Sequence, residues 1–201
     1  MRSLLLALAV ALSALALPQA ARADGDGLYG RFDGDFRLSV AAGGGARIGA
    51  RTVGIGLVEL RARYLDSAGV FVTGDSDDGA WRVTAGVELR PLFPARFLLG
   101  LESGARFFDL LVDSFTLELG IAATRLSTDP LAGVVLGVGF DVPLVVEPFR
   151  LAVHLGFRWT YEAQRRLPDE TDIALLAALV VDFGVRTGLA PREGPRSIAV
   201  P

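Results

Sequence analysis

Apolar and polar residues alternate one by one along most of the chain, and this period restricts its fold more than any other feature. Successive side chains of a β-strand point to opposite faces, so alternation predicts a strand with one apolar and one polar face. The clearest case is the stretch 81–90, whose two faces are Trp81, Val83, Ala85, Val87 and Leu89 against Arg82, Thr84, Gly86, Glu88 and Arg90.

The same alternation predicts seven further strands, which cover 36–40, 58–64, 97–107, 115–121, 134–141, 149–159 and 173–186. The last of these is apolar on both faces in its first half and could begin as a helix, but its β-branched end favours a strand. Strands of about ten residues match the length that a tilted membrane strand needs. Turn-forming residues separate the strands at 43–45, 75–79, 91–94, 127–130, 143–148 and 168–172, and 66–80 is left as the longest connection.

The first residues of the chain have a different character. Arg2 precedes the apolar run 4–17, which is shorter than the roughly 20 residues of a spanning helix, and Ala21-Arg22-Ala23 follows it. This order is typical of a secretory signal peptide cleaved after Ala23. We therefore expect an exported protein with a signal peptide at 1–23, an N-terminal extension at 24–34, a barrel domain at 35–187 and a loose tail at 188–201.

Alternation alone does not say which face of the strands points inward. An arginine that faces lipid at the bilayer centre costs roughly 2–4 kcal/mol, and aromatic residues at strand ends, such as Trp81 and Trp159, are typical of membrane barrels. We therefore expect an all-β fold, a transmembrane antiparallel up-and-down barrel of eight strands with charges paired in a narrow lumen. The expected luminal network is Arg37, Glu59, Arg61, Arg63, Arg82, Glu88, Arg90, Glu102, Arg106, Glu118, Asp141, Arg150, His154, Arg158, Asp182 and Arg186.

In this strand pattern, residues 35–186 resemble the small eight-stranded outer membrane barrels, the OmpA, OmpX and OmpW-like group. The resemblance implies a place in the cell outer membrane, contact with its lipid and recognition by the barrel-assembly machinery. Such proteins commonly end on an aromatic residue, whereas here a tail follows Phe183. With both termini in the periplasm, the connections near 44, 94, 128 and 165 would face outward and 66–80 would be periplasmic.

The chain carries little that points to chemistry. Its single histidine, His154, lies on the charged face of the strand 149–159, and Gly156 stands where an enzyme resembling the lipid A deacylases would have a serine. The aspartates within 75–78 do not have the spacing of a calcium loop, so we expect no metal and no cofactor. A net charge of −3 argues against nucleic acid as a partner, and the absence of cysteine excludes disulfides.

These observations favour an outer membrane barrel with a structural or interaction role and no enzymatic activity. Three alternatives are left open by the sequence. The barrel could pass small or apolar ligands, as OmpW-like proteins are thought to, or it could modify lipid with His154 as a general base. It could also be a soluble periplasmic barrel of the lipocalin type, with its two faces reversed.

Overall fold

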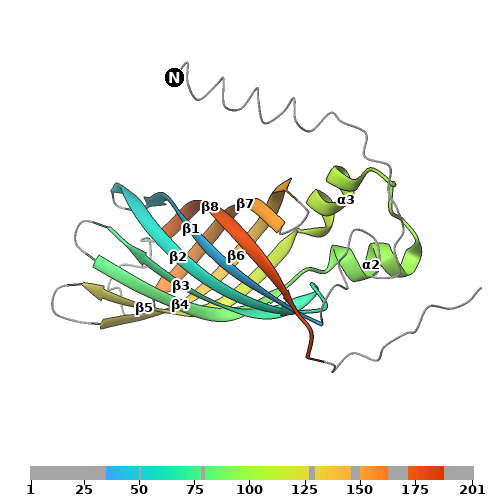
Figure 1. The fold of residues 1–201 in the computed structure, drawn as a ribbon. Coiled ribbons are helices and arrows are strands. Elements are labelled where there is room, and N and C mark those ends of the chain that lie inside the picture. Colours follow the sequence, from blue (N-terminus) through green and yellow to red (C-terminus); the bar gives the residue numbers. More distant parts are fainter. Residues whose placement is uncertain are drawn as a thin grey trace, which may run out of the picture.

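A computed structural model describes residues 35–49, 51–77, 80–126, 130–145, 150–162 and 172–187. Its strands form one closed antiparallel barrel in chain order (Figure 1), which confirms the expected eight-stranded up-and-down barrel. The expected signal peptide, N-terminal extension and C-terminal tail lie outside the described residues. The strands are β1 (Phe36–Ile48), β2 (Thr52–Tyr64), β3 (Ala68–Ser76), β4 (Ala80–Leu89), β5 (Thr116–Leu126), β6 (Pro130–Val145), β7 (Arg150–Glu162) and β8 (Asp172–Val185).

β1 closes the barrel because it pairs with both β2 and β8. Phe36 lies opposite Tyr64 of β2 on one side and opposite Val185 of β8 on the other. The first strand therefore begins where the last one ends, and we call this end of the barrel the terminus end and the opposite one the distal end. Closure gives each of the described strands two neighbours, so the described sheet has no edge strand.

The expected strand at 97–107 is wrong, because this segment belongs to two short helices between β4 and β5. α2 spans Leu92–Leu99 and α3 spans Arg106–Asp113. Gly100 and Gly104 between them have φ angles of 62° and 77°, a left-handed conformation that glycine adopts readily and that a strand does not contain. In so short a run, alternation and helical spacing are hard to tell apart.

The sequence pattern also missed one strand, β3, which lies in the segment expected to be the longest connection. β3 alternates like the other strands, since Phe71 and Thr73 are buried whereas Val70 and Val72 are exposed. The missed strand and the wrong one offset each other, so the expected total of eight strands holds.

The glycine-rich segment 43–45, expected to be a turn, lies inside β1. A Cβ atom at Gly43 or Gly45 would lie 2.1 Å and 1.9 Å from the carbonyl oxygens of Ala177 and Leu175 on β8, respectively. Glycine at these two positions therefore allows the two backbones to approach closely.

The extra strand reverses the direction of β4 and so moves the next connection to the other end of the barrel. Residues 90–115, with α2 and α3, lie at the terminus end, beyond the end of the strands (Figure 1). This corrects the expectation that the connection near position 94 faces the side opposite the termini. It also replaces the expected 66–80 connection by a tight turn at 65–67 and the strand β3.

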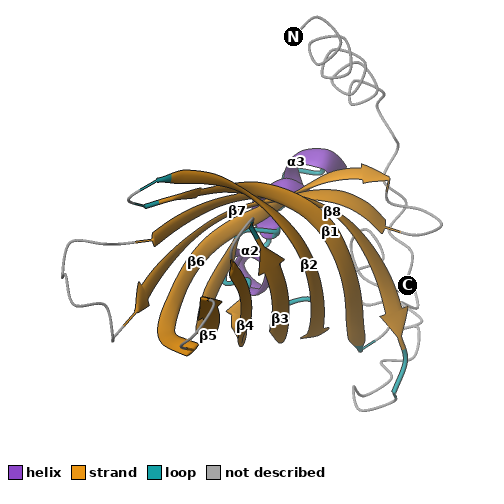
Figure 2. Cartoon of the chain, turned by 90° about the vertical axis from the view of Figure 1, so that its left-hand side faces the viewer, coloured by secondary structure: helices purple, strands orange, loops and turns teal. Residues whose placement is uncertain are grey.

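The barrel wall is apolar outside, and its interior holds the charged side chains together with a smaller apolar cluster. Figure 2 looks into the barrel from the distal end and shows the strands enclosing an interior. Val58 and Ile121 are among the exposed apolar residues of the wall, whereas Arg63 and Glu88 are buried in the interior. Among the described residues, no helix is both long and apolar enough to cross a membrane.

Candidate functional site: the charged lumen

Ion pairs occupy the lumen in three groups, and the central group is built around Arg61 of β2. Its Nε donates to Glu59 at 2.5 Å, its Nη1 to Glu88 at 2.5 Å and its Nη2 to Glu118 at 2.8 Å. All four side chains are buried. The planar guanidinium carries five N–H donors and can therefore serve three carboxylates from β2, β4 and β5 at once.

Arg158 of β7 is the second cation of the central group. It donates from Nε to Glu118 at 2.6 Å, from Nη2 to Glu59 at 2.5 Å and from Nη1 to the hydroxyl of Thr73 at 2.9 Å. Its guanidinium carbon also lies 5.0 Å from the centre of the Phe71 ring, within cation–π range. Arg158 thereby connects β7 with β2, β3 and β5 across the lumen.

At the terminus end, Asp66 in the turn after β2 lies within ion-pair distance of four arginines. Arg90 donates to it at 3.1 Å and Arg150 at 3.3 Å, while the Nε atoms of Arg63 and Arg37 lie at 3.6 Å and 3.8 Å. Burial alone would raise the pKa of the Asp66 carboxyl, but the positive charges of Arg90, Arg37, Arg63 and Arg150 outweigh it and hold the pKa below its ordinary value.

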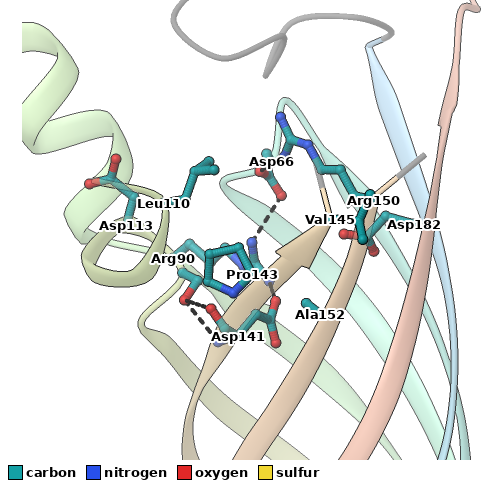
Figure 3. A pocket seen from close by; sticks show the side chains of 11 residues that line it. Asp66, Arg90, Leu110, Asp113, Asp141, Pro143, Val145, Arg150, Ala152 and Asp182 are labelled. Carbon is teal, nitrogen blue, oxygen red and sulfur yellow. Dashed lines mark hydrogen bonds and ion pairs between the residues drawn. The ribbon is translucent and has the colours of Figure 1, made fainter. Parts of the chain in front are cut away.

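The same terminus-end group extends to the carboxylates of β6 and β8. Arg63 donates from Nη2 to Asp182 at 3.0 Å and to Ser39 at 2.6 Å, and Arg90 donates to Asp141. A cavity of about 40 Å³ is lined in part by Arg90, Asp141 and Asp182 (Figure 3). At about 10–15 Å³ for each water molecule, this volume holds a few waters at most. It is far smaller than the about 300–1,000 Å³ of most small-molecule sites.

The distal group contains two arginines and three aspartates. Arg47 of β1 donates to Asp77 at 2.5 Å and also to Asp75, and Arg82 of β4 donates to Asp172 of β8. Arg47 Nε lies 3.5 Å from Asp172, so one carboxylate contacts both arginines. The described lumen is thus bridged by charged side chains near both ends and in the middle.

His154 connects the central group with the terminus-end group, and its surroundings determine its tautomer. Its Nδ1 lies 2.7 Å from Asp141 Oδ1, and its Nε2 lies 3.1 Å from Arg61 Nη2. An arginine nitrogen can only donate, so Nε2 must accept and Nδ1 must carry the proton that is donated to Asp141. The nitrogen that a general base would use is therefore already in contact with Arg61.

We expect His154→Ala to lower the free energy of unfolding by about 1–3 kcal/mol, because it leaves a buried acceptor on Asp141 and a buried donor on Arg61 without their partner. The measurement is urea unfolding of the protein in detergent micelles. His154→Asn is the matched control, since its amide N–H can still donate to Asp141 and should lose less. Equal stability of wild type and the alanine variant would show that these contacts do not form.

The structure brings most of the expected network residues into the interior and excludes a few. The interior ones are buried: Arg37, Glu59, Arg61, Arg63, Arg82, Glu88, Arg90, Glu118, Asp141, His154, Arg158 and Asp182. Arg150 is half-buried at the terminus end. The expectation is wrong for Glu102 and Arg106, which belong to the helical connection instead of a strand, and for Arg186, which is exposed beyond the end of β8.

Several charged partners escaped the sequence pattern. Arg47 was missed because the glycines before it suggest a turn, and Asp66 and Asp75 because they fall in the supposed long connection. The alternation from Phe71 through Thr73 could have placed Asp75 on the inward face. Asp172 stands at the boundary between an expected turn and an expected strand.

Comparisons with known proteins find a distant structural similarity. No family model matches the sequence, and no curated protein matches it. Among solved structures, the chain is similar to the crystal structure of Neisserial surface protein A, with 14% sequence identity and a TM-score of 0.42 over 74% of this chain and 97% of that chain. Among the described residues, no group of three or more histidine, cysteine, aspartate or glutamate side chains could hold a metal ion.

Proposed function

We propose that the chain is an outer membrane β-barrel protein with a structural or interaction role and a lumen closed by ion pairs. One observation carries this proposal: large apolar side chains cover the outside of the barrel, while arginines and carboxylates are buried and paired inside it. Water would favour the reverse arrangement, whereas lipid outside and pairing inside satisfy both faces.

The dimensions of the wall agree with a bilayer. β2 has 13 residues. At about 3.3 Å per residue and a tilt of about 40–45°, a strand of this length rises roughly 30 Å, the thickness of the hydrocarbon core. Exposed aromatic residues occur toward both ends, with Tyr64 and Phe183 near the terminus end and Trp81 and Trp159 near the distal end. Such belts suit the two membrane–water interfaces.

The polarity of the inner and outer faces of the barrel argues against a soluble barrel of the lipocalin type. Such a barrel keeps apolar residues inside, around a ligand, and polar residues outside. Here Val58, Leu60 and Ile121 would instead expose their side chains to water, as part of an apolar surface that extends around the barrel. Soluble monomers rarely expose contiguous apolar surface on that scale.

The contents of the lumen favour a closed barrel without catalysis. Arg61 and Arg158 bridge the middle of the lumen, and apolar residues such as Leu57, Leu176 and Val180 fill space on its β1, β2 and β8 side. His154 has both ring nitrogens in contact with charged neighbours, which argues against a role as general base.

We expect the purified protein in planar lipid bilayers to show no steady conductance, because paired side chains cross the lumen at three levels. An open porin measured in the same membrane provides the positive control. Stable single-channel steps would contradict the closed lumen and favour passage of small solutes. A histidine-dependent change in the mass of lipid A in overproducing cells would contradict the non-enzymatic role.

A further inference from the structure

The helical connection between β4 and β5 has the same inverted polarity as the barrel wall. Three of its charged groups meet between the helices: Arg96 of α2 donates to Asp109 at 2.6 Å and to Asp113 at 2.7 Å, and both carboxylates on α3 are buried. The backbone N–H groups of Ser103 and Gly104 donate to Asp109 as well. The two helices are therefore held together by polar contacts on their inner side.

The outer side of the same unit is apolar. Leu98 is 80%, Leu99 70% and Leu101 60% exposed, and Phe97 and Phe108 are exposed to a lesser degree. Residues 97–101 contain no charged side chain. The inner side, between the helices, is occupied by the ion pairs of Arg96 with Asp109 and Asp113.

The helical connection joins the barrel near two residues whose side chains belong to the apolar outside of the wall. The chain leaves the wall after Leu89 and returns to it at Thr116. Leu89 and the next residue, Leu117, are paired neighbours that both expose their side chains outward. α2 begins three residues after Leu89. α3 is fastened to the barrel end through Ser114, whose hydroxyl accepts from the backbone N–H of Asp141 at 2.8 Å.

We propose that α2 and the following residues to Leu101 insert their apolar side chains into the lipid leaflet at the terminus end of the barrel and anchor that end in the interface. This proposal rests on the proposed function, since it extends the lipid-facing wall by one further element. A short helix with leucine and phenylalanine on its outer side and its only charge turned away suits the boundary between headgroups and acyl chains.

The test uses the natural absence of cysteine to place one nitroxide spin label at a time. Leu98→Cys and Leu99→Cys report on the proposed anchor, Val87→Cys on the barrel wall, and Arg51→Cys on the exposed turn at the distal end. The labelled full chain is reconstituted in phosphatidylcholine–phosphatidylglycerol vesicles. Power saturation then compares collisions with oxygen, which concentrates in lipid, and with a water-soluble nickel complex.

We expect the ratio of oxygen to nickel collisions at Leu98 and Leu99 to exceed the ratio at Arg51 several-fold and to approach the value at Val87. A ratio like that of Arg51, with Val87 still in lipid, would overturn the anchor and leave the membrane barrel intact. Protection from both reagents would also overturn it, because it would mean that protein and not lipid covers α2. Water exposure at Val87 would overturn the proposed function itself.

Discussion

Replacing Arg61 with methionine should lower the free energy of unfolding by about 3–5 kcal/mol, the range for breaking a buried ion pair by removing one partner. Arg61 serves Glu59, Glu88 and Glu118, and each donated hydrogen bond measures 2.8 Å or less. Methionine fills much of the same volume but offers no donor. Glu59 and Glu118 would then keep Arg158 as their cation, and Glu88 would keep only the more distant Nε of Arg63 at 3.6 Å.

Unfolding in urea, followed by the fluorescence of Trp81 and Trp159, measures this effect. Arg51→Met is the matched control, because Arg51 is exposed in the turn after β1 and its loss should change stability by no more than about 0.5 kcal/mol. Adding Glu88→Gln to Arg61→Met removes the charge of a carboxylate that has lost its hydrogen bond from Arg61, and should restore part of the loss. A loss for Arg61→Met as small as that of the control would mean that water, not Arg61, satisfies these carboxylates.

Replacing Val58 with arginine should destabilise the barrel in lipid by about 2–4 kcal/mol, the cost of an arginine on the lipid face near the bilayer midplane. Val58 lies in the middle of β2 and is 62% exposed on the outside of the wall. No described neighbour on that face offers a carboxylate in an ion pair, so the new charge would meet lipid chains.

The depth of the position provides the control for this prediction. Ile48 is also exposed, but it ends β1 at the distal end, where an arginine should cost only about 0–1 kcal/mol. Both variants are compared with wild type by reversible unfolding in phospholipid vesicles. Equal and small effects at the two positions would contradict a lipid-facing wall, because an arginine on a water-facing strand changes stability by no more than about 0.5 kcal/mol.

The sequence alone determined that the chain is a barrel with charges on one face and apolar residues on the other. This was possible because the strand period of two is visible in the sequence itself, as in 81–90 and 149–159. For a barrel in a membrane, the inward direction of the charged face also followed from the sequence, since the cost of arginine in lipid leaves one arrangement there. The strand character of 173–186 followed from its β-branched end.

The local sequence pattern was insufficient where a strand and another kind of structure can have the same pattern. Residues 97–107 alternate, yet the glycines at 100 and 104 adopt left-handed angles and the segment forms α2, a turn and α3. Conversely, β3 is short and carries glycine and aspartate, which resemble a turn when read one residue at a time. The pairing of β3 with both β2 and β4 supplies the backbone partners that make it a strand.

Only the tertiary structure decided which charges meet. Arg61 lies on β2 and Glu118 on β5, strands that are not neighbours in the sheet, and the two side chains touch because a closed barrel of eight strands has a narrow interior. The contact of His154 with Asp141 depends in the same way on the register between β6 and β7, in which these two residues lie opposite each other. Register and closure arise from all the strands together, so no single stretch of sequence contains them.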